Sequence, residues 1–352
     1  MAVDPSEPVE IPIDGTLDLH TFHPRDTKDL VRDYIDACLE SGIRDVRIIH
    51  GKGTGALRRT VHATLNKNPA VESYHLAGED GGSWGATLVT LTREVPDLQL
   101  VNFLKASERI LAFVGAGIST SSGIPDFRGP QGTWTKRRPI YYQDFMTSES
   151  ARSEYWQQKL EDWELIREAQ PNAVHKALVR LEEAGKLEML VSQNIDGLHL
   201  KAGTSFERLV ELHGTVSQVE CQSCGARSDP EPHLDAFRKD KVAPDCSCDG
   251  YLKSATISFG QNLKEADLQR AAAAAEKADS VFALGSTLSV TPAASFPLVA
   301  AQRGVPYIII NKGPTEHDRE PNVSLRLEGD VTQIFPPAVE VALQGDAARY
   351  SS

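Results

Sequence analysis

Several features that would assign this chain to a class are missing from its sequence. No apolar run approaches the roughly 20 residues that a membrane-spanning helix needs. The first ten residues, MAVDPSEPVE, are acidic and contain two prolines, unlike a secretory signal or an arginine-rich transit peptide, so we expect a cytoplasmic protein without a membrane partner. Cysteine is scarce, at 5 of 352 residues. Without a signal peptide, disulfides are the poorer interpretation of these cysteines.

Positive charge is also in short supply. The formal net charge of −12 at pH 7 argues against a nucleic-acid coat along the whole chain, but a local basic face is compatible with it. A chain of 352 residues is long enough for two domains. The Val95-Pro96-Asp97 run interrupts the pattern and predicts the linker between them. We expect a flexible tail over 1–12, a first domain over 13–95, a second over 96–340 and a C-terminal tail over 341–352.

Both expected domains alternate strand-like and helix-like segments. In the first, strands are predicted at 16–20, 46–51, 71–77 and 86–92, and helices at 27–40 and 55–65. In the second, a helix at 98–109 precedes strands at 110–114, 189–192, 281–285, 307–311 and 325–327. The second series indicates an α/β fold, a Rossmann-like doubly wound parallel sheet with helices on both faces. The first indicates a small, separate α/β domain.

A glycine-rich turn follows the first strand of the second domain. Residues 115–129 read GAGISTSSGIPDFRG, and we expect this turn to open a helix that carries an acid–arginine pair, Asp126 and Arg128. Gly115 and Gly117 have no side chains, so backbone N–H groups at the turn can approach a pyrophosphate closely. The turn therefore predicts a dinucleotide site.

The acid that holds the ribose in many dehydrogenases is missing. It is expected about 20 residues after the glycines, where this chain reads TKRR at 135–138. Small polar residues instead follow later strands, as Gly285-Ser286-Thr287 and Asn311. Ligands of open α/β sheets bind at the carboxyl ends of the strands. The pattern predicts a dinucleotide site that does not transfer hydride.

Four cysteines form two close pairs, in the runs CQSC at 221–224 and CSC at 246–248. Four thiolates in this arrangement suit tetrahedral zinc. We expect a closed, structural site in a module spanning about 219–252, which chelation should unfold. The alternative is a redox-active C-x-x-C motif. The predicted zinc ligands are Cys221, Cys224, Cys246 and Cys248.

The glycine turn, QNID at 193–196, ELHG at 211–214 and the cysteine pairs together resemble the sirtuins, NAD-dependent protein deacylases, over about residues 98–340. In this family the acyl-lysine oxygen attacks the anomeric carbon of NAD and expels nicotinamide. A ribose hydroxyl activated by a histidine then takes the acyl group, which gives free lysine and O-acyl-ADP-ribose. The resemblance implies that His213 is the general base and that Asn194 is the second catalytic residue.

The resemblance also implies the ligand contacts. The NAD-binding residues would be Gly115, Ala116, Gly117, Ile118, Ser119, Asp126, Phe127, Arg128, Gln193, Asn194, Asp196, Gly285, Ser286, Asn311 and Asp330. An acyl-lysine peptide would add as a strand between 258–261 and 286–290. Its contacts would be Phe259, Gly260, Ser286, Leu288 and Val290.

The stretch 137–163 is most similar to class II sirtuins, the mitochondrial and bacterial type. Sirtuins that prefer acidic acyl groups carry an arginine three residues after a tyrosine here, whereas Gln158 follows Tyr155 at that spacing. A succinyl carboxylate would lose its charge partner, which favours neutral acyl groups.

Each of these residues also has an ordinary structural interpretation. His213 can be a loop histidine with one hydrogen bond, and Asp126 can cap a helix. Asn194 and Asp196 can be turn formers. It is their occurrence together that favours the site.

The expected first domain contains LDLH at 17–20, HGKGTG at 50–55 and GSWGAT at 82–87. These motifs resemble small MutS-related (Smr) domains over about residues 14–94, a family of nucleic-acid binders and nucleases, some of which act on ribosome-associated RNA. Residues 44–67 contain six basic side chains and one acid, a patch suited to a DNA or RNA backbone. The candidate nucleic-acid residues are Asp18, His20, His50, Lys52, Arg58 and Arg59.

The chemistry of this first domain stays open. Asp18, His20 and His50 could bind a divalent metal or hydrolyse a phosphodiester by acid–base chemistry. Alternatively, Asp18 and His20 only orient the glycine loop. Trp84 is the one candidate for base stacking, and it can equally be a core residue.

Four functions are compatible with these motifs. The first is an NAD-dependent protein-lysine deacylase whose Smr domain localises it on DNA, RNA or a ribosome. The same pocket could instead serve an NAD hydrolase or a protein ADP-ribosyltransferase. An Smr nuclease with a regulatory NAD-binding half is a third function, and a binding module with an inactive pocket is the fourth.

Overall fold

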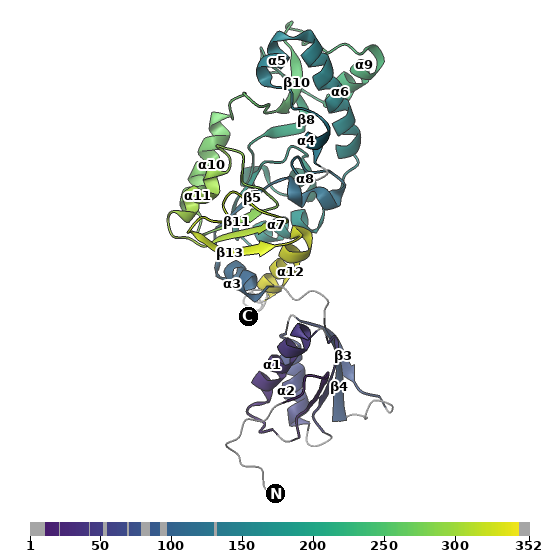
Figure 1. Ribbon diagram of the computed structural model, residues 1–352, viewed down its shortest axis with the longest axis vertical. Helices are drawn as coiled ribbons and strands as arrows, with labels where there is room; N and C mark the ends of the chain where they lie inside the picture. Colours follow the sequence, from purple (N-terminus) through teal and green to yellow (C-terminus); the bar gives the residue numbers. More distant parts are fainter. Residues whose placement is uncertain are drawn as a thin grey trace. The chain divides into compact units, whose positions relative to one another are not determined.

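The computed structural model describes residues 11–20, 22–41, 43–51, 55–68, 70–78, 85–91, 97–129 and 132–344 (Figure 1). The chain divides into two compact units, residues 1–96 and 97–352. Most of the expected N-terminal tail, linker residues Val95 and Pro96, and residues 345–352 lie outside the described residues. Within the described part of the chain, no helix is long and apolar enough to span a bilayer.

The smaller unit is a four-stranded sheet with two helices. Its elements are β1 (Thr16–Asp18), α1 (Thr27–Glu40), β2 (Asp45–Ile49), α2 (Ala56–Leu65), β3 (Val71–Leu76) and β4 (Ala86–Leu91). The strand order is β1-β2-β4-β3, with β1 parallel to β2 and the other pairs antiparallel. Val31 and Ile35 of α1 and Val61 of α2 bury their side chains in one core with Ile48 of β2. The predicted strand at 16–20 ends at Asp18 because the Asp18 carboxylate accepts a hydrogen bond from the backbone N–H of His20 and turns the chain.

The larger unit contains a six-stranded, fully parallel sheet. Its strands are β5 (Ile110–Val114), β6 (Leu187–Ser192), β7 (Leu209–Glu211), β11 (Ser280–Leu284), β12 (Tyr307–Asn311) and β13 (Val323–Glu328). Their order is β13-β12-β11-β5-β6-β7. The predicted Rossmann-like sheet is therefore confirmed.

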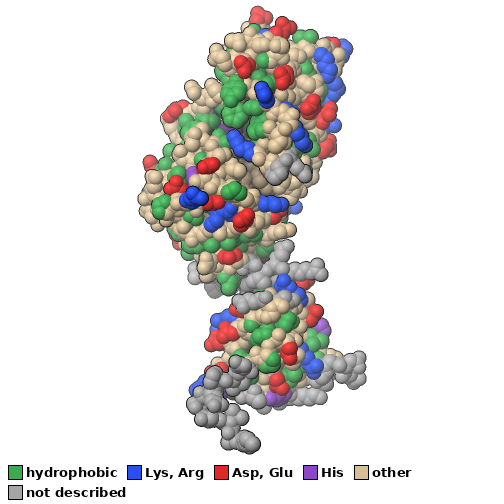
Figure 2. Space-filling view, in the orientation of Figure 1, with side chains coloured by type: hydrophobic (Ala, Val, Ile, Leu, Met, Phe, Trp, Pro, Cys, Tyr) green, Lys and Arg blue, Asp and Glu red, His purple; other side chains and the backbone are tan. Residues whose placement is uncertain are grey.

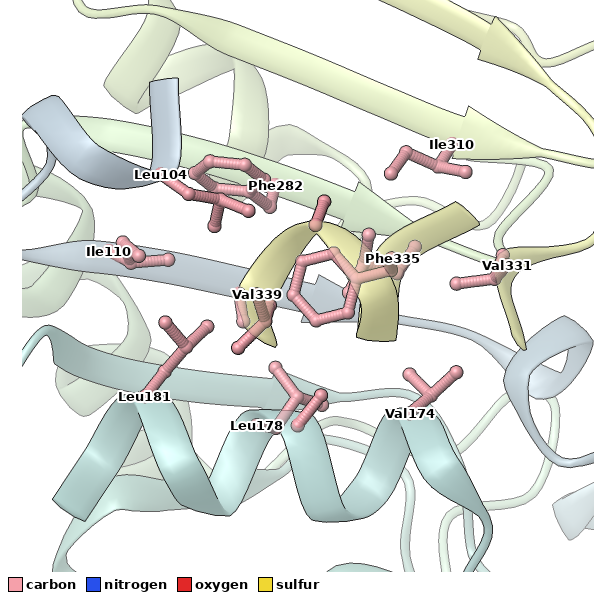
Figure 3. Packing of buried hydrophobic residues seen from close by; sticks show 14 of the residues in the cluster. Leu104, Ile110, Val174, Leu178, Leu181, Phe282, Ile310, Val331, Phe335 and Val339 are labelled. Carbon is pink, nitrogen blue, oxygen red and sulfur yellow. The ribbon is translucent and has the colours of Figure 1, made fainter. Parts of the chain in front are cut away.

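Helices cover both faces of this sheet. They are α3 (Leu98–Ala106), α7 (Ala173–Glu183), α8 (Leu198–Ala202), α10 (Glu265–Lys277), α11 (Ser295–Ala301) and α12 (Val331–Gln344), joined by the 3₁₀ helices η3 (Ala116–Ile118), η4 (Thr120–Ser122) and η5 (Phe206–Arg208). Alternate residues of each strand enter opposite cores. Ile110 of β5 packs with α3, α7 and α12, while Leu111 packs with α10 and α11. Figure 3 shows Phe335 of α12 facing Leu178 of α7 in the first core. Helix α12 continues to Gln344, beyond the residue 340 at which the sequence places the domain end.

The larger unit also contains a small antiparallel sheet, whose strand order is β10-β8-β9 and which packs with several helices. Its elements are α4 (Thr133–Lys136), α5 (Tyr142–Thr147), α6 (Glu149–Ile166), β8 (Gly214–Cys221), β9 (Arg227–Ser228), α9 (Pro230–Asp240) and β10 (Leu252–Thr256). Trp156 of α6 and Phe237 of α9 form its core with Val219 of β8.

Candidate functional site

The parallel sheet reverses its strand order between β5 and β11. Strands β6 and β7 are added on one side of β5, and β11, β12 and β13 on the other. In open α/β sheets a ligand binds beyond the carboxyl ends of the strands at such a point. Here β5 leads into Gly115 and β11 leads into Gly285, and the N–H of Gly117 donates to the carbonyl of Gly285 at 2.9 Å.

The glycines of this turn are required by close packing between the two strand ends. A Cβ atom at Gly115 or at Gly117 would lie 2.7 Å from the carbonyl oxygen of Gly285, which is inside van der Waals contact. Gly285 itself has a φ of +60°, in the left-handed region that favours glycine. Substitution at these positions therefore disturbs the crevice even before a ligand is considered.

The prediction that this turn opens a helix carrying Asp126 and Arg128 is wrong. Only the short 3₁₀ helices η3 and η4 follow β5, because Gly123 ends η4 with a φ of +86° and Pro125 follows. Asp126 lies in a loop, where its carboxylate accepts from the N–H of Gly129 at 2.7 Å. Arg128 is exposed.

Three buried polar side chains form a hydrogen-bonded cluster at the turn. The hydroxyl of Ser119 donates to Asp196 Oδ2 at 2.7 Å and accepts from Asn194 Nδ2 at 3.2 Å. Asn194 Nδ2 also donates to the carbonyl of Gly115 at 3.2 Å. Asn194 Oδ1 is buried and has no hydrogen-bond partner among the described residues. Since an unpaired buried acceptor is costly, this atom fits a donor supplied by a ligand.

The remaining predicted NAD residues lie at neighbouring strand ends. Gln193 Nε2 donates to the hydroxyl of Ser286 at 2.7 Å, which links the end of β6 to the end of β11. Asn311 ends β12 and is 7% exposed. Asp330 Oδ1 accepts from the N–H of Thr332 at 2.9 Å, at the start of α12.

His213 lies two residues after β7, with one ring nitrogen engaged. Its Nδ1 donates to the carbonyl of Gln193 at 2.9 Å, so Nε2 is the nitrogen that can accept a proton. Burial lowers the pKa of His213, and the positive charge of Arg128 lowers it further, while the bond to Gln193 opposes the shift. The imidazole is therefore neutral near pH 7, as a general base requires.

Glu211 is a titratable group that the sequence did not predict as a site residue. Burial raises the pKa of its carboxyl to about 7, and the negative charges of Asp196 and Asp267 add to the rise. Its place in the ELHG motif, two residues before His213, was the available signal. A carboxyl whose pKa is raised to about 7 thus lies two residues before the candidate base in the chain.

Four aromatic side chains from separate segments form a row. Phe127 stacks on Trp134 with ring centroids 5.4 Å apart, and Phe259 lies 6.2 Å from Trp134 and 5.9 Å from Tyr141. Phe259 and Tyr141 are 38% and 53% exposed. Figure 2 shows hydrophobic side chains gathered on the upper part of this unit, near α4 and β10 of Figure 1. The segment predicted to meet a peptide thus has an exposed apolar surface.

Of the other predicted peptide residues, Leu288 is the least accessible. Its side chain is 2% exposed and lies in the core beside α10 and α11, with a φ of +55°. Only its backbone is therefore available to a peptide.

The four paired cysteines form a compact cluster. Cys221 lies at the end of β8, and Cys246 and Cys248 precede β10. The Sγ atoms of Cys221 and Cys248 are 3.6 Å apart, those of Cys224 and Cys246 are 3.9 Å apart, and all four lie within 4.8 Å of one another. A tetrahedral zinc–thiolate site has sulfur atoms about 3.8 Å apart, so the cluster fits zinc. The backbone N–H groups of Cys224 and Ser223 lower the pKa of Cys221 to about 6, which favours the thiolate.

In the smaller unit, Asp18 and His20 form a pair at the end of β1, beside the glycine loop at 50–55. Asp18 Oδ1 accepts from His20 Nδ1 at 2.6 Å. A Cβ atom at Gly51 would lie 2.8 Å from His20 Nε2, so the imidazole lies against the backbone of Gly51. This contact favours an orienting role for the pair. Lys52 and Trp84 lie outside the described residues.

His50, one of the predicted nucleic-acid residues, belongs to a hydrogen-bonded histidine group that was not predicted. His50 is 4% exposed, and its Nδ1 donates to the carbonyl of Gly51 at 3.1 Å. Its Nε2 therefore accepts from the hydroxyl of Thr87 at 2.9 Å, and that oxygen accepts in turn from His62 Nε2 at 3.0 Å. Burial lowers the pKa of both histidines, which keeps this bridge neutral.

Two arginines of α2 gather at the end of the loop. A Cβ atom at Gly55 would lie 3.6 Å from Arg59 Nη1 and 3.7 Å from Arg58 Nη2.

The cysteines are the sole group of at least three potential metal ligands in the part of the chain that the structure describes. The structure does not bring Asp18, His20 and His50 together as such a group.

Both units are similar to known families and proteins. The Sir2 family model matches residues 115–292, and the Smr domain model matches residues 17–92. "NAD-dependent protein deacetylase 1" of Bradyrhizobium diazoefficiens is 41% identical over 242 residues, which cover 68% of this chain and 94% of that protein. An "NAD-dependent protein deacetylase" of Haloarcula marismortui is 37% identical over 242 residues, which cover 67% and 91%.

Solved structures agree with these relatives. A Sir2 protein with a p53 peptide and NAD+ has a TM-score of 0.61 at 31% identity, over 71% of this chain and 98% of that chain. A Sir2 variant with a deacetylated p53 peptide and 3′-O-acetyl ADP ribose has a TM-score of 0.64 at 30% identity, with the same coverage.

Proposed function

The chain belongs to the Sir2 family and carries an Smr domain, and on this premise we propose that it is an NAD-dependent protein-lysine deacetylase. The observation that carries the proposal is a chain of hydrogen bonds where the parallel sheet reverses its strand order: His213 is held by the carbonyl of Gln193, and the next residue, Asn194, is held by Ser119. We take 13–95 as the Smr domain and 96–344 as the sirtuin domain, since α12 continues to Gln344. The cytoplasmic location stays a prediction.

We assign the NAD site to residues that surround this crevice. The unpaired Oδ1 of Asn194 and the close approach of the Gly115 and Gly285 turns support the assignment. When bound, NAD supplies a ribose whose bond to nicotinamide breaks and whose hydroxyl receives the acyl group. The proposed contacts are Gly115, Ala116, Gly117, Ile118, Ser119, Asp126, Phe127, Arg128, Gln193, Asn194, Asp196, Gly285, Ser286, Asn311 and Asp330.

His213 moves the proton in this mechanism. Because its Nδ1–H is held by the carbonyl of Gln193, Nε2 takes the proton of the ribose hydroxyl. Asn194 is held by two hydrogen bonds from its amide group to Gly115 and Ser119, so its Oδ1 is fixed in place to receive a ligand donor. Preorganised groups of this kind lower the barrier without reorganising during the reaction.

The acyl-lysine peptide meets the aromatic row in this proposal. Phe259 and Gly260 would contact it on one side, and Ser286, the Leu288 backbone and Val290 on the other. The amide of Gln158 donates to the carbonyl of Arg138, and an amide offers no charge to a carboxylate. We therefore propose neutral acyl groups as the preferred cargo.

The zinc ion has a structural role in this scheme. Bound by Cys221, Cys224, Cys246 and Cys248, it would hold the end of β8 to the segment that enters β10. The N–H of Ile257, directly after β10, donates to the carbonyl of His213 at 2.7 Å. A zinc module that holds β10 in place would therefore also help to hold the backbone of the candidate base.

A product assay tests the deacetylase proposal. The full chain is incubated with NAD and an acetyl- or octanoyl-lysine peptide, with and without RNA, and the products are identified by mass spectrometry. Free lysine peptide and O-acyl-ADP-ribose are the expected products. Nicotinamide with free ADP-ribose and an unchanged peptide would contradict the proposal and favour an NAD hydrolase.

For the smaller unit we propose nucleic-acid binding, with DNA or RNA as the partner. The support is the pair of guanidinium groups at Gly55 beside the glycine loop, together with the basic stretch 44–67. Phosphate contacts give binding that weakens steeply with salt. A salt titration of DNA and RNA oligonucleotide binding tests this; binding insensitive to salt would contradict it.

A further inference from the structure

One arginine that the sequence did not single out, Arg326, donates hydrogen bonds to the last residue of β12, to the loop between β12 and β13, and to β13 itself. Arg326 lies on β13 opposite Ile309 of β12. Its Nε donates to Asp318 Oδ1 at 2.7 Å, and its Nη1 donates to the carbonyl of Asn311 at 3.2 Å. The guanidinium also donates to the carbonyls of Leu327 and Gly313.

Two of these acceptors determine the position of Asn311. The carbonyl of Gly313 accepts from Arg326 and also from Asn311 Nδ2, the latter at 3.1 Å. The carbonyl of Asn311 accepts from Arg326 and from the N–H of Gly329 at 3.2 Å. The backbone and the side chain of Asn311 are therefore both held through oxygens that Arg326 contacts.

The Arg326 guanidinium is suited to holding Asn311 in place, and its charge is already paired. It is planar and always charged, and it presents its donors in a fixed fork. Asp318 balances its charge, and the side chain is only 20% exposed. Hydrogen bonds from charged donors to backbone carbonyls are stronger than neutral ones, so they can fix a loop that contains a glycine.

We propose that Arg326 is a positioning residue that holds Asn311 in the conformation required by the adenosine half of NAD. The proposal rests on the NAD site proposed above. Loss of Arg326 should weaken the binding of NAD and of ADP-ribose while the acyl-transfer chemistry at His213 continues once the ligand is bound.

The test compares Arg326→Met with a matched control. Arg303 Nη1 donates to the carbonyls of Ala275 and Ala278 at 2.9 and 3.0 Å, and it lies before β12, at the opposite end of the strand from Asn311. Arg303→Met thus removes bonds of the same kind away from the site. For each variant and the wild type, calorimetry gives the Kd for ADP-ribose, and a deacetylation assay gives KM for NAD and kcat.

We expect Arg326→Met to raise the Kd and KM about tenfold, with kcat changed less than about twofold, because one charge-assisted bond is of this order. Arg303→Met should leave all three values near those of the wild type. If Arg326→Met does not fold, Arg326→Lys is measured instead and should give a smaller rise. Unchanged affinity in Arg326→Met, or in Arg326→Lys where that variant is measured instead, would overturn the proposal, as would an equal rise in Arg303→Met. Failure of the wild type to bind ADP-ribose or to release nicotinamide would overturn the proposed function as well.

Discussion

Replacing Glu211 by glutamine tests the electrostatics of the site directly. The usual pKa of a glutamate is 4.5, and burial raises that of Glu211 to about 7. Between these two values the folded state keeps the proton that the unfolded state has lost, so stability falls as pH rises through this window. The difference between the two pKa values corresponds to a loss of at most about 3 kcal/mol in the free energy of unfolding. We expect a loss of about 1–3 kcal/mol because the Glu211 side chain keeps some solvent contact. Glutamine has a similar shape and no charge, so it should remove this loss.

The assay is denaturant unfolding at about pH 5 and about pH 8, followed by tryptophan fluorescence. Trp134, Trp156 and Trp163 all lie in the larger unit. Glu211→Gln should be more stable than the wild type at the higher pH and similar to it at the lower pH. Glu168→Gln is the control, since that side chain is 77% exposed. Equal pH dependence in Glu211→Gln and the wild type would refute the reasoning.

Three further predictions concern the base, the metal and the basic patch. His213→Ala should abolish the formation of free lysine peptide and O-acyl-ADP-ribose, the products of the step that follows nicotinamide release, while zinc content and folding stay intact; formation of these products at the wild-type rate, measured by chromatography, would remove the general-base assignment. A zinc chelator should lower the Tm of the larger unit and release about one zinc per chain, and Cys224→Ser should do the same; a Tm unaffected by metal loss would contradict a structural site. Charge reversal at Arg58 and Arg59 should weaken nucleic-acid binding and reduce its salt slope by about 1 for each phosphate that is no longer neutralised; an unchanged slope would refute the basic-patch argument, and Lys201→Glu in the other unit is the matched control.

Short-range signals in the sequence predicted much of the fold. Helix α1 has the predicted bounds because its apolar residues recur at regular helical spacing and the signals that end the helix lie in neighbouring residues of the sequence. The cysteine pairs predicted a cluster that fits zinc, since spacings of two and one residues keep the two thiols of each pair close together. The turn after β5 was misjudged, because Gly123 and Pro125 break the helix that its composition otherwise allows.

Contacts between distant segments were not predictable. The Asn311–Arg326 connection depends on the register of β12 against β13, and the His50–Thr87–His62 bridge joins three separate elements of the smaller unit. Glu211 lies in a predicted motif, yet its raised pKa follows from burial, which is a property of the folded chain. Sequence motifs thus predicted the candidate site, while the groups around it that shift pKa values or hold side chains in place follow from packing.

The most direct test of the central claim is the product ratio of the full chain with NAD and an acetyl-lysine peptide. Coupled deacetylation predicts nicotinamide, deacetylated peptide and O-acetyl-ADP-ribose in equal amounts, with neither deacetylated peptide nor O-acetyl-ADP-ribose formed by His213→Ala. Nicotinamide in large excess over deacetylated peptide, with free ADP-ribose as the second product, would contradict the account.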